Sequence, residues 1–231
     1  MKHKLLLSIL LALLLIFSFG CKAEEEKAEI LPSQEEKVEE KPEEKIEDEQ
    51  EGKERGSFTI VDALNREISF TSRPQRVVAI GPGALRLYLY VAEVDKLVGV
   101  EDMERQEKEG RPYHLAYPEL RELTVIGPGG PRNAPDPEKL LEVEPDVIFS
   151  MYTGEAESVE KLQEKTGIPV VALSYGKKEV FDPELYKSLE LIGEVMGTQR
   201  GKEVVAMMEA WKEDLDKRTK DIPQEDRPRV Y

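Results

Sequence analysis

The sequence predicts an α/β fold: a parallel, Rossmann-like sheet with a small β-hairpin before it and a long helix after it. Short apolar runs rich in β-branched residues alternate with segments of helical pattern, which is typical of βαβ units and a parallel sheet. The run at residues 77–80 ends in Gly81-Pro82-Gly83, and a helix-prone segment follows at once. After residue 182 the pattern is wholly helical, and no proline interrupts residues 199–220.

The first twenty residues have the pattern of a secretion signal. Two lysines precede an almost wholly apolar run at residues 5–17, which is shorter than the ~20 residues of a stable membrane span. Gly20 stands directly before Cys21, an arrangement that resembles a bacterial lipobox, although Ser18 stands where lipoboxes usually have leucine. We therefore expect a cleaved signal peptide at residues 1–20 and a membrane-anchored lipoprotein outside the cytoplasm, periplasmic or at the cell surface. An uncleaved signal anchor is the alternative.

Residues 21–55 are expected to hold the lipidated Cys21 and a disordered acidic tether. From Lys22 to Arg55 there are 15 Asp and Glu against 7 Lys and Arg, and no aromatic residue. Such a segment cannot bury enough apolar surface to offset its chain entropy. Its like charges repel and extend it, which suits a spacer between a lipid anchor and a folded body.

The charge and the cysteine count narrow the class of protein. The net charge is −15, and the part after residue 55 is also acidic. An acidic body argues against nucleic acid and against an anionic membrane surface as partners. Because Cys21 is the only cysteine, the folded part has no disulfide framework.

The folded part begins with an α/β lobe, which we expect at residues 56–182. Two β-rich runs around the polar Leu64-Asn65 predict the hairpin. Asp136 followed by Pro137 is the signal of a helix N-terminus. Strands are expected at residues 58–63, 66–70, 77–80, 97–100, 146–150 and 169–173, and helices at residues 84–92, 138–143 and 155–166.

Residues 183–226 predict a pair of helices. The first covers residues 184–196 and ends at Gly197, and the second covers residues 199–220, about 30 Å at the rise of an α-helix. The apolar positions of the second helix are most simply explained as core. Residues 227–231 resemble the start of a further strand.

Four loops follow predicted strands or strand-like runs, at residues 81–86, 128–133, 150–153 and 174–176. Because parallel strands end at one edge of a sheet, where open α/β sheets bind ligands, we expect these loops to converge. Gly83 permits a close approach of ligand to backbone, and the helix that begins at Ala84 would direct unpaired N–H groups at that ligand. We therefore take Gly83 and Ala84 as ligand contacts. An ordinary strand-to-helix turn is the alternative.

Five side chains in these loops are further candidates for ligand binding. Arg86 lies in a first helical turn, where a cation opposes the helix dipole, and that small cost suggests an anionic ligand. Arg132, with Asn133 beside it, offers bidentate contacts to a carboxylate, catecholate or oxyanion. Tyr152 and Tyr175 directly follow strands and are placed to stack on a ligand or bond to it. A solvated arginine and tyrosines that simply pack at strand ends are the alternatives.

The sequence predicts no catalytic set, no resident cofactor and no metal site. His114 is the only histidine after the signal, and a lone histidine without ligand spacing is more often structural. Ser150 and Ser174 lack a Gly-x-Ser-x-Gly context. We therefore expect a binding protein rather than an enzyme, with an extracytoplasmic α/β enzyme as the alternative.

Several segments, taken together and in this order, resemble the helical-backbone class (class III) of ABC-transporter substrate-binding proteins, which serve iron-siderophore, haem and cobalamin importers. These segments are residues 73–79, 94–100, 126–133, 137–148 and 166–171. The resemblance covers roughly residues 57–231. It implies two α/β lobes joined by one rigid helix, so that residues 199–220 form this helix and residues 227–231 begin a second lobe that is absent from the chain.

The resemblance also implies a function. The protein would capture an iron-siderophore or a related ferric chelate and deliver it to an ABC permease and its ATPase, without covalent chemistry. Molybdate or tungstate, haem and corrinoids are alternative ligands for the same fold, and a truncated remnant that binds nothing is a further alternative. The Tyr152 position lies in the ligand cleft of relatives. Glu138 matches the position that docks on a permease arginine, although a glutamate there also complements the helix dipole.

Overall fold

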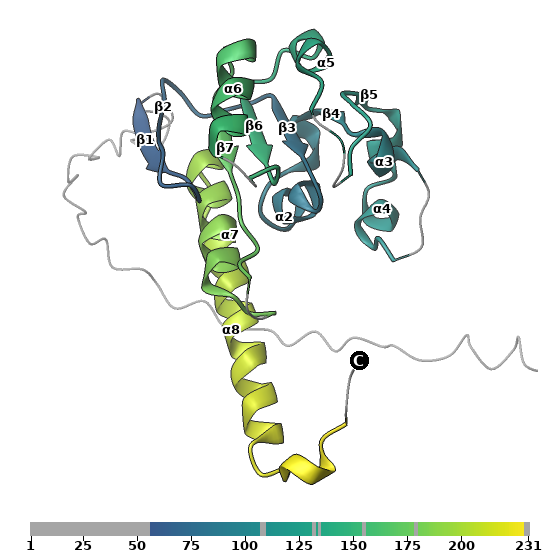
Figure 1. The fold of residues 1–231 in the computed structure, drawn as a ribbon, viewed down its shortest axis with the longest axis vertical. Helices are drawn as coiled ribbons and strands as arrows, with labels where there is room; N and C mark the ends of the chain where they lie inside the picture. Colours follow the sequence, from purple (N-terminus) through teal and green to yellow (C-terminus); the bar gives the residue numbers. More distant parts are fainter. Residues whose placement is uncertain are drawn as a thin grey trace, which may run out of the picture. The chain divides into compact units, whose positions relative to one another are not determined.

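The computed structural model describes residues 56–106, 110–130, 133, 135–153, 156–177 and 180–228 (Figure 1). The expectations for the signal peptide, Cys21, the acidic tether, Arg132 and residues 229–231 therefore lie outside the described residues. Within the described ranges, no helix combines the length and the apolar character that a membrane crossing needs.

The predicted hairpin is formed by β1 (Phe58–Val61) and β2 (Glu67–Phe70), which pair antiparallel. The strands are shorter than expected because the buried Asp62 side chain, rather than the partner strand, accepts the hydrogen bonds of the backbone at the turn. Its Oδ1 accepts hydrogen bonds from the backbone N–H of Leu64 (2.9 Å) and Arg66 (3.0 Å). Its Oδ2 accepts from the N–H of Ala172 at 3.1 Å, so the turn is fastened to the edge of the main sheet.

The main sheet has five parallel strands in the order β5-β4-β3-β6-β7. Their bounds are β3 (Val77–Ile80), β4 (Leu97–Val100), β5 (Thr124–Val125), β6 (Val147–Ser150) and β7 (Val170–Ala172). The central strands β3 and β6 are buried at every residue. The chain moves outward from β3 to β4 and β5, then returns to β6 on the other side of β3. The direction of winding therefore reverses between β3 and β6, the place where open α/β sheets form a crevice.

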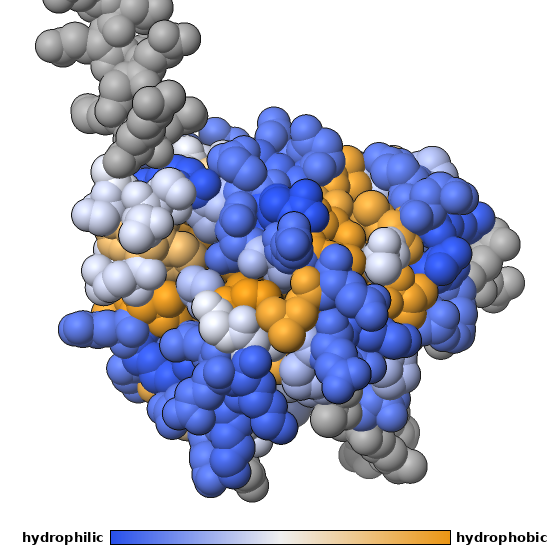
Figure 2. All heavy atoms as spheres, turned by 90° about the horizontal axis from the view of Figure 1, so that it is seen from above, coloured by the Kyte–Doolittle hydropathy of each residue, from blue (hydrophilic) through white to orange (hydrophobic). Residues whose placement is uncertain are grey.

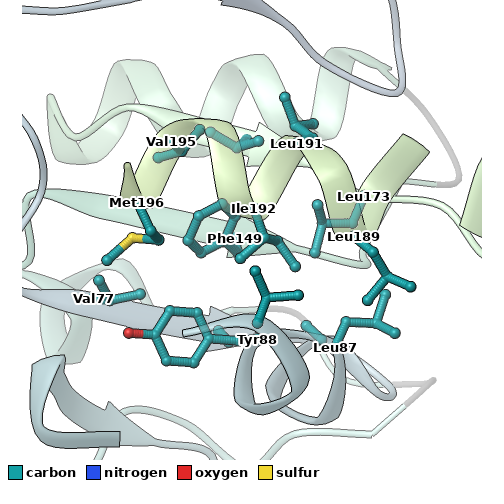
Figure 3. Packing of buried hydrophobic residues seen from close by; sticks show 14 of the residues in the cluster. Val77, Leu87, Tyr88, Phe149, Leu173, Leu189, Leu191, Ile192, Val195 and Met196 are labelled. Atoms are coloured by element: carbon teal, nitrogen blue, oxygen red, sulfur yellow. The ribbon is translucent and has the colours of Figure 1, made fainter. Parts of the chain in front are cut away.

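Alternate residues of β3 point into two hydrophobic clusters, one on each face of the sheet. The first cluster packs α2 (Ala84–Val91), α7 (Pro183–Met196) and the start of α8 (Arg200–Thr219) on the sheet. Figure 3 shows Phe149 of β6 between Tyr88 of α2 and the apolar face of α7, with 5.9 Å between the two ring centroids. The second cluster includes side chains of α5 (Pro137–Glu142) and α6 (Ala156–Thr166).

The predicted N-cap of α5 is confirmed, because the Asp136 carboxylate accepts a hydrogen bond from the N–H of Lys139 at 3.3 Å. In the described part of residues 101–122, for which the sequence predicts no element, there are three short helices. These are α3 (Asp102–Arg105), α4 (Tyr113–Ala116) and the 3₁₀ helix η3 (Pro118–Glu122). Each has at most five residues, which is too few to produce a recognisable hydrophobic period. Single 3₁₀ turns also occur at η2 (Val94–Lys96) and η4 (Gln224–Asp226).

The predicted long helix is confirmed as α8, twenty residues in length. Its first turns pack tightly on α7, where a Cβ on Gly201 would lie 2.3 Å from the carbonyl oxygen of Leu189. The expectation that the apolar positions of this helix belong to the core is wrong for its later turns, where Trp211 and Leu215 are 55% and 50% exposed. In Figure 1 this part of α8 runs beyond the sheet. The view from above in Figure 2 shows a mainly hydrophilic face, as the charged composition predicts, with smaller apolar areas between the polar side chains.

Candidate functional site

A surface hollow of about 510 Å³ lies at the carboxyl edge of the sheet, beside the N-terminus of α2. We call it the Arg86 hollow, and its lining includes Gly83, Arg86, Tyr90, Arg111, Tyr113 and Tyr175. Other hollows of similar size occur beside α8, so size alone does not select this one. The Arg86 hollow is distinguished by two arginines and three tyrosines, which offer hydrogen-bond donors and aromatic faces. Glu104 also lines the hollow and pairs with Arg111, so the unpaired positive charge comes from Arg86.

Arg86 and Tyr175 form one unit in this hollow. The Arg86 guanidinium donates through Nη2 to the Tyr175 hydroxyl at 3.0 Å, and that hydroxyl donates to the carbonyl oxygen of Gly83 at 2.8 Å. Burial raises the pKa of Tyr175, although the nearby Arg86 lowers it, so the phenol keeps its proton. Within the part of the chain that the structure describes, no carboxylate pairs with Arg86. Its charge is therefore available to an anionic ligand.

Gly83 is needed for this arrangement. Its φ is +84°, and a Cβ there would lie 2.0 Å from the Tyr175 hydroxyl oxygen. The glycine thus admits the tyrosine ring as well as allowing the sharp turn. Ala84, predicted as a ligand contact through its backbone, is completely buried in the hydrophobic core, and its N–H donates to the carbonyl oxygen of Gly81 at 3.2 Å.

Tyr152 lies at the same edge of the sheet, but its hydroxyl is directed at the protein itself. It lies 2.9 Å from Glu101 Oε1 and 3.0 Å from the carbonyl oxygen of Gly130. The other oxygen of Glu101 accepts from the N–H of Gly81 at 3.0 Å. Tyr152 also lines a separate hollow of about 220 Å³ against α6. The structure therefore brings Arg86 and Tyr175 together and places Tyr152 in a neighbouring network.

The environment of Glu101 is unusual for a carboxylate. Its side chain is only 3% exposed. Burial raises the pKa of Glu101, and the hydrogen bonds from Gly81 and Tyr152 lower it by less. Burial, together with Glu101, also raises the pKa of the Tyr152 hydroxyl. Glu101 and Tyr152 thereby connect loops that follow four different strands, which fixes the shape of the edge beside the Arg86 hollow.

The remaining predicted residues have simpler positions. Asn133 is exposed, and its side-chain amide donates to the carbonyl oxygen of Gly129, which closes its own loop. It is not part of the lining of the Arg86 hollow. Glu138 is exposed in the first turn of α5. Arg132 lies outside the described residues, so its predicted role stays a prediction.

A second buried carboxylate, Glu104 of α3, borders the Arg86 hollow. Its Oε2 accepts from Arg111 Nη1 at 2.8 Å and from the Tyr113 hydroxyl at 2.8 Å, and it lies 3.1 Å from His114 Nε2. Burial and Glu104 raise the pKa of Tyr113, although Arg111 and Arg86 both lower it. Both arginines are therefore close enough to act on the same phenol.

The serines and the histidine have structural partners. Ser150 Oγ accepts from the N–H of Tyr152, and Ser174 Oγ accepts from the N–H of Gly176. His114 is buried against Glu104. In the ranges that the structure covers, no three His, Cys, Asp or Glu side chains are grouped as metal ligands would be. The arrangement is suited to holding an anion, by charge, hydrogen bonds and aromatic contact.

Sequence reasoning missed Glu101, Glu104, Arg111 and Tyr113. For Glu101 a signal was present, because it is the first residue after the buried strand 97–100 and so had to lie at the carboxyl edge. The other three come from a stretch without periodicity. Only their contacts in the fold bring them to the hollow.

Comparison with known proteins places the chain among binding proteins. The profile of the family described as periplasmic binding protein matches residues 77–231, more than half of the chain. The uncharacterised ABC transporter substrate-binding lipoprotein YvrC of Bacillus subtilis is 23% identical over 174 residues, which cover 75% of this chain and 51% of YvrC. The molybdate-binding protein MolA of Haemophilus influenzae is 26% identical over 189 residues, covering 74% of this chain and 52% of MolA.

A solved structure of MolA bound to molybdate has the same fold as this chain. It aligns with a TM-score of 0.62 and 27% sequence identity, over 74% of this chain and 56% of MolA. The chain thus spans about half the length of the curated relatives that it matches.

Proposed function

Because this chain belongs to the periplasmic binding protein family, we propose that it is the solute-binding component of an ABC importer, acting outside the cytoplasm. It would capture its ligand at the carboxyl edge of the sheet and deliver it to a permease and its ATPase. The observation that carries the proposal is the Arg86 hollow, in which Arg86 and Tyr175 present an uncompensated cation and an aromatic ring.

The chemistry of the hollow favours an anionic metal chelate, such as a ferric siderophore. Tyrosine rings offer flat apolar faces to the organic part of a chelate, and guanidinium groups match carboxylate or catecholate oxygens. The volume of about 510 Å³ also lies in the range of roughly 300–1,000 Å³ that is usual for organic ligands. A single tetrahedral oxyanion would leave most of this space empty.

Molybdate is nevertheless the second candidate, because the relative MolA is named as a molybdate-binding protein. A small oxyanion would interact with the Arg86 guanidinium and with N–H or O–H donors, and would make little use of the aromatic faces. The two candidates therefore differ in what they require of Tyr175.

Titration calorimetry of this chain with a ferric tris-catecholate complex, sodium molybdate and cobalamin tests the proposal. We expect the ferric complex to bind without being chemically changed, and Arg86→Gln to weaken that binding by roughly tenfold or more. Arg105→Gln removes the same charge from an exposed position on α3 and serves as the matched control. Tighter binding of molybdate than of the ferric complex would favour the second candidate. Absence of binding for all three probes would overturn the function proposed here.

The location proposed for the protein depends on its N-terminal residues. The basic and apolar pattern of residues 1–20, followed by Cys21, supports export and attachment to the membrane through a lipid on that cysteine. Cell fractionation tests this proposal, because Cys21→Ser should move the protein from the membrane fraction to the soluble fraction. An unchanged distribution would exclude the lipid anchor.

A further inference from the structure

Glu104 is a buried carboxylate whose hydrogen-bond partners, among the described residues, come from one short segment. It is 3% exposed, and its Oε2 contacts Arg111, Tyr113 and His114 at 2.8, 2.8 and 3.1 Å. Burial of an unpaired carboxylate is costly, and the contacts with this segment offset that cost. Residues 111–113 of this segment in turn form one wall of the Arg86 hollow.

In the described ranges, few other polar contacts attach this segment to α3. The hydrogen bonds of its backbone stay local, from His114 N–H to the Arg111 carbonyl at 3.0 Å and from Tyr117 N–H to the Tyr113 carbonyl at 2.9 Å. One further hydrogen bond joins the segment to α3, from Arg111 Nη1 to the carbonyl oxygen of Met103 at 2.7 Å. Tyr113 also packs against the first hydrophobic cluster. The Glu104 carboxylate is therefore the main polar contact that sets the position of this wall relative to α3.

Arg111 keeps donors for a ligand while it is held in this way. Both of its hydrogen bonds use Nη1. Its Nε and Nη2 have no partner among the residues that the structure describes. These two nitrogens carry parallel N–H groups, which match the two oxygens of one carboxylate or catecholate. Arg111 lines the same hollow as Arg86, and its side chain is 18% exposed.

We propose that Arg111 is a second cationic contact for the ligand and that Glu104 is the positioning residue that holds Arg111 and Tyr113 at the hollow. This inference rests on the proposed function and deepens it. A ligand with two separate anionic groups, such as a catecholate or carboxylate chelate, would engage both arginines.

For Glu104→Gln, the proposal predicts a change in ligand affinity opposite to the one that electrostatics alone predicts. Glu104 is a negative charge beside a site for an anion. If its charge were all that mattered, Glu104→Gln would strengthen binding. If Glu104 positions the wall, Glu104→Gln weakens binding, because an amide cannot accept from all the donors that the carboxylate now accepts from.

Two measurements on this chain test the proposal. The first is calorimetric titration with the ferric tris-catecholate complex for the parent chain, Glu104→Gln, Tyr113→Phe and Arg111→Gln. The second is hydrogen exchange of the amides of residues 111–117 without any ligand. Glu119→Gln is the matched control for the glutamate, since it removes the same charge from an exposed site, and Arg105→Gln is the matched control for the arginine.

We expect Arg111→Gln to weaken binding by roughly tenfold or more, and Glu104→Gln to weaken binding while accelerating exchange in residues 111–117 by about tenfold. Tyr113→Phe, which removes one donor only, should change both quantities in the same direction by less. The two control variants should stay within roughly twofold of the parent.

Several results would overturn the proposal. Tighter binding by Glu104→Gln would mean that Glu104 competes with the ligand for Arg111. If hydrogen exchange is unchanged in Glu104→Gln, Glu104 does not position the wall. If ligand binding is unchanged in Arg111→Gln, Arg111 is not a second contact for the ligand. If the parent chain binds no probe, the proposed function fails, while hydrogen exchange still decides whether Glu104 holds the wall.

Discussion

Glu101 illustrates how single residues shape the binding edge. It accepts hydrogen bonds from the loop after β3 and from Tyr152 in the loop after β6, and Tyr152 also reaches Gly130. A buried carboxylate in this position joins loops that are far apart in sequence. The cost is that the ionised form is poorly solvated, which raises the pKa of Glu101.

This raised pKa predicts a specific dependence of stability on pH. An acid whose pKa is higher in the folded state stabilises the fold fully below its ordinary value of 4.5, and loses that contribution as the pH rises through the folded-state pKa. Glu101→Gln has no such titration. The melting temperature of the parent minus that of Glu101→Gln should therefore fall as the pH rises from 4.5 to 7.

Glu119→Gln is the control for this measurement, because Glu119 is exposed. The melting temperature of the parent minus that of Glu119→Gln should stay nearly constant between pH 4.5 and 7. A difference for Glu101→Gln that grows with pH would show that the hydrogen bonds from Gly81 and Tyr152 outweigh the effect of burial.

At the scale of elements, α8 has two halves with different environments. Its early residues Gly201, Val204 and Val205 are buried, whereas Met207, Trp211 and Leu215 are exposed at successive i, i+4 positions along one face. Ion pairs four residues apart, such as Lys217–Glu213 and Arg218–Asp214, lie along the same outer turns. The outer half of the helix is thus stabilised locally, with little help from the core.

Leu→Ala substitutions at one buried and one exposed position test this difference between the core and the outer half of α8. Leu189→Ala in α7 removes a side chain with no exposed surface and should lower the free energy of unfolding by about 2–5 kcal/mol. Leu215→Ala removes a half-exposed side chain and should change it by less than about 0.5 kcal/mol. Urea denaturation followed by circular dichroism measures both. Comparable losses would show that Leu215 is packed against something in solution, which sedimentation would reveal as self-association.

The hairpin is attached to the main sheet by hydrogen bonds between its turn and β7. The Asp62 carboxylate accepts hydrogen bonds from backbone N–H groups of the turn and from the N–H of Ala172. The N–H of Ala63 donates to the Ala172 carbonyl at 3.1 Å. Because β7 is an edge strand, these bonds occupy backbone groups that would otherwise be exposed. The alternating pattern of the hairpin was visible in the sequence, but its place beside β7 was not.

At the scale of the whole molecule, the proposed function requires a surface for the permease in addition to a site for the ligand. Glu138 is exposed on α5 and does not line the Arg86 hollow. A docking role for this glutamate stays a proposal, based on the family to which the chain belongs. Capture and delivery would then use different surfaces, and a substitution on α5 should separate them.

Glu138→Lys should leave binding of the ferric complex unchanged. In vesicles with the cognate permease and ATPase, it should weaken productive docking by roughly tenfold or more, because a lysine would face the permease arginine. Stimulation of ATP hydrolysis by the loaded protein measures this effect. Glu142→Lys, an equal change of charge at an exposed position one turn later, is the control. Equal losses in both variants would assign the effect to net charge and remove the specific role of Glu138.

The amino-acid sequence was enough to predict the parallel α/β architecture, the hairpin, the long α8 and the bounds of most helices to within two residues. These features follow from local signals: apolar runs of fixed period, glycine and proline at turns, and Asp136 as an N-cap. The sequence also pointed to Arg86 and Tyr175, because the exits of parallel strands share one edge of a sheet.

Which of the candidate residues act together became clear only from the folded chain. The fold joins Arg86 to Tyr175 through one hydrogen bond between residues 89 positions apart, directs Tyr152 toward Glu101, and brings Glu104 and Arg111 to the hollow from a stretch without periodicity. The physical reason is that local signals set the conformation of the backbone, whereas the partner of a polar side chain depends on which distant groups share its burial. A carboxylate's neighbours are fixed by packing, and packing is a property of the whole fold.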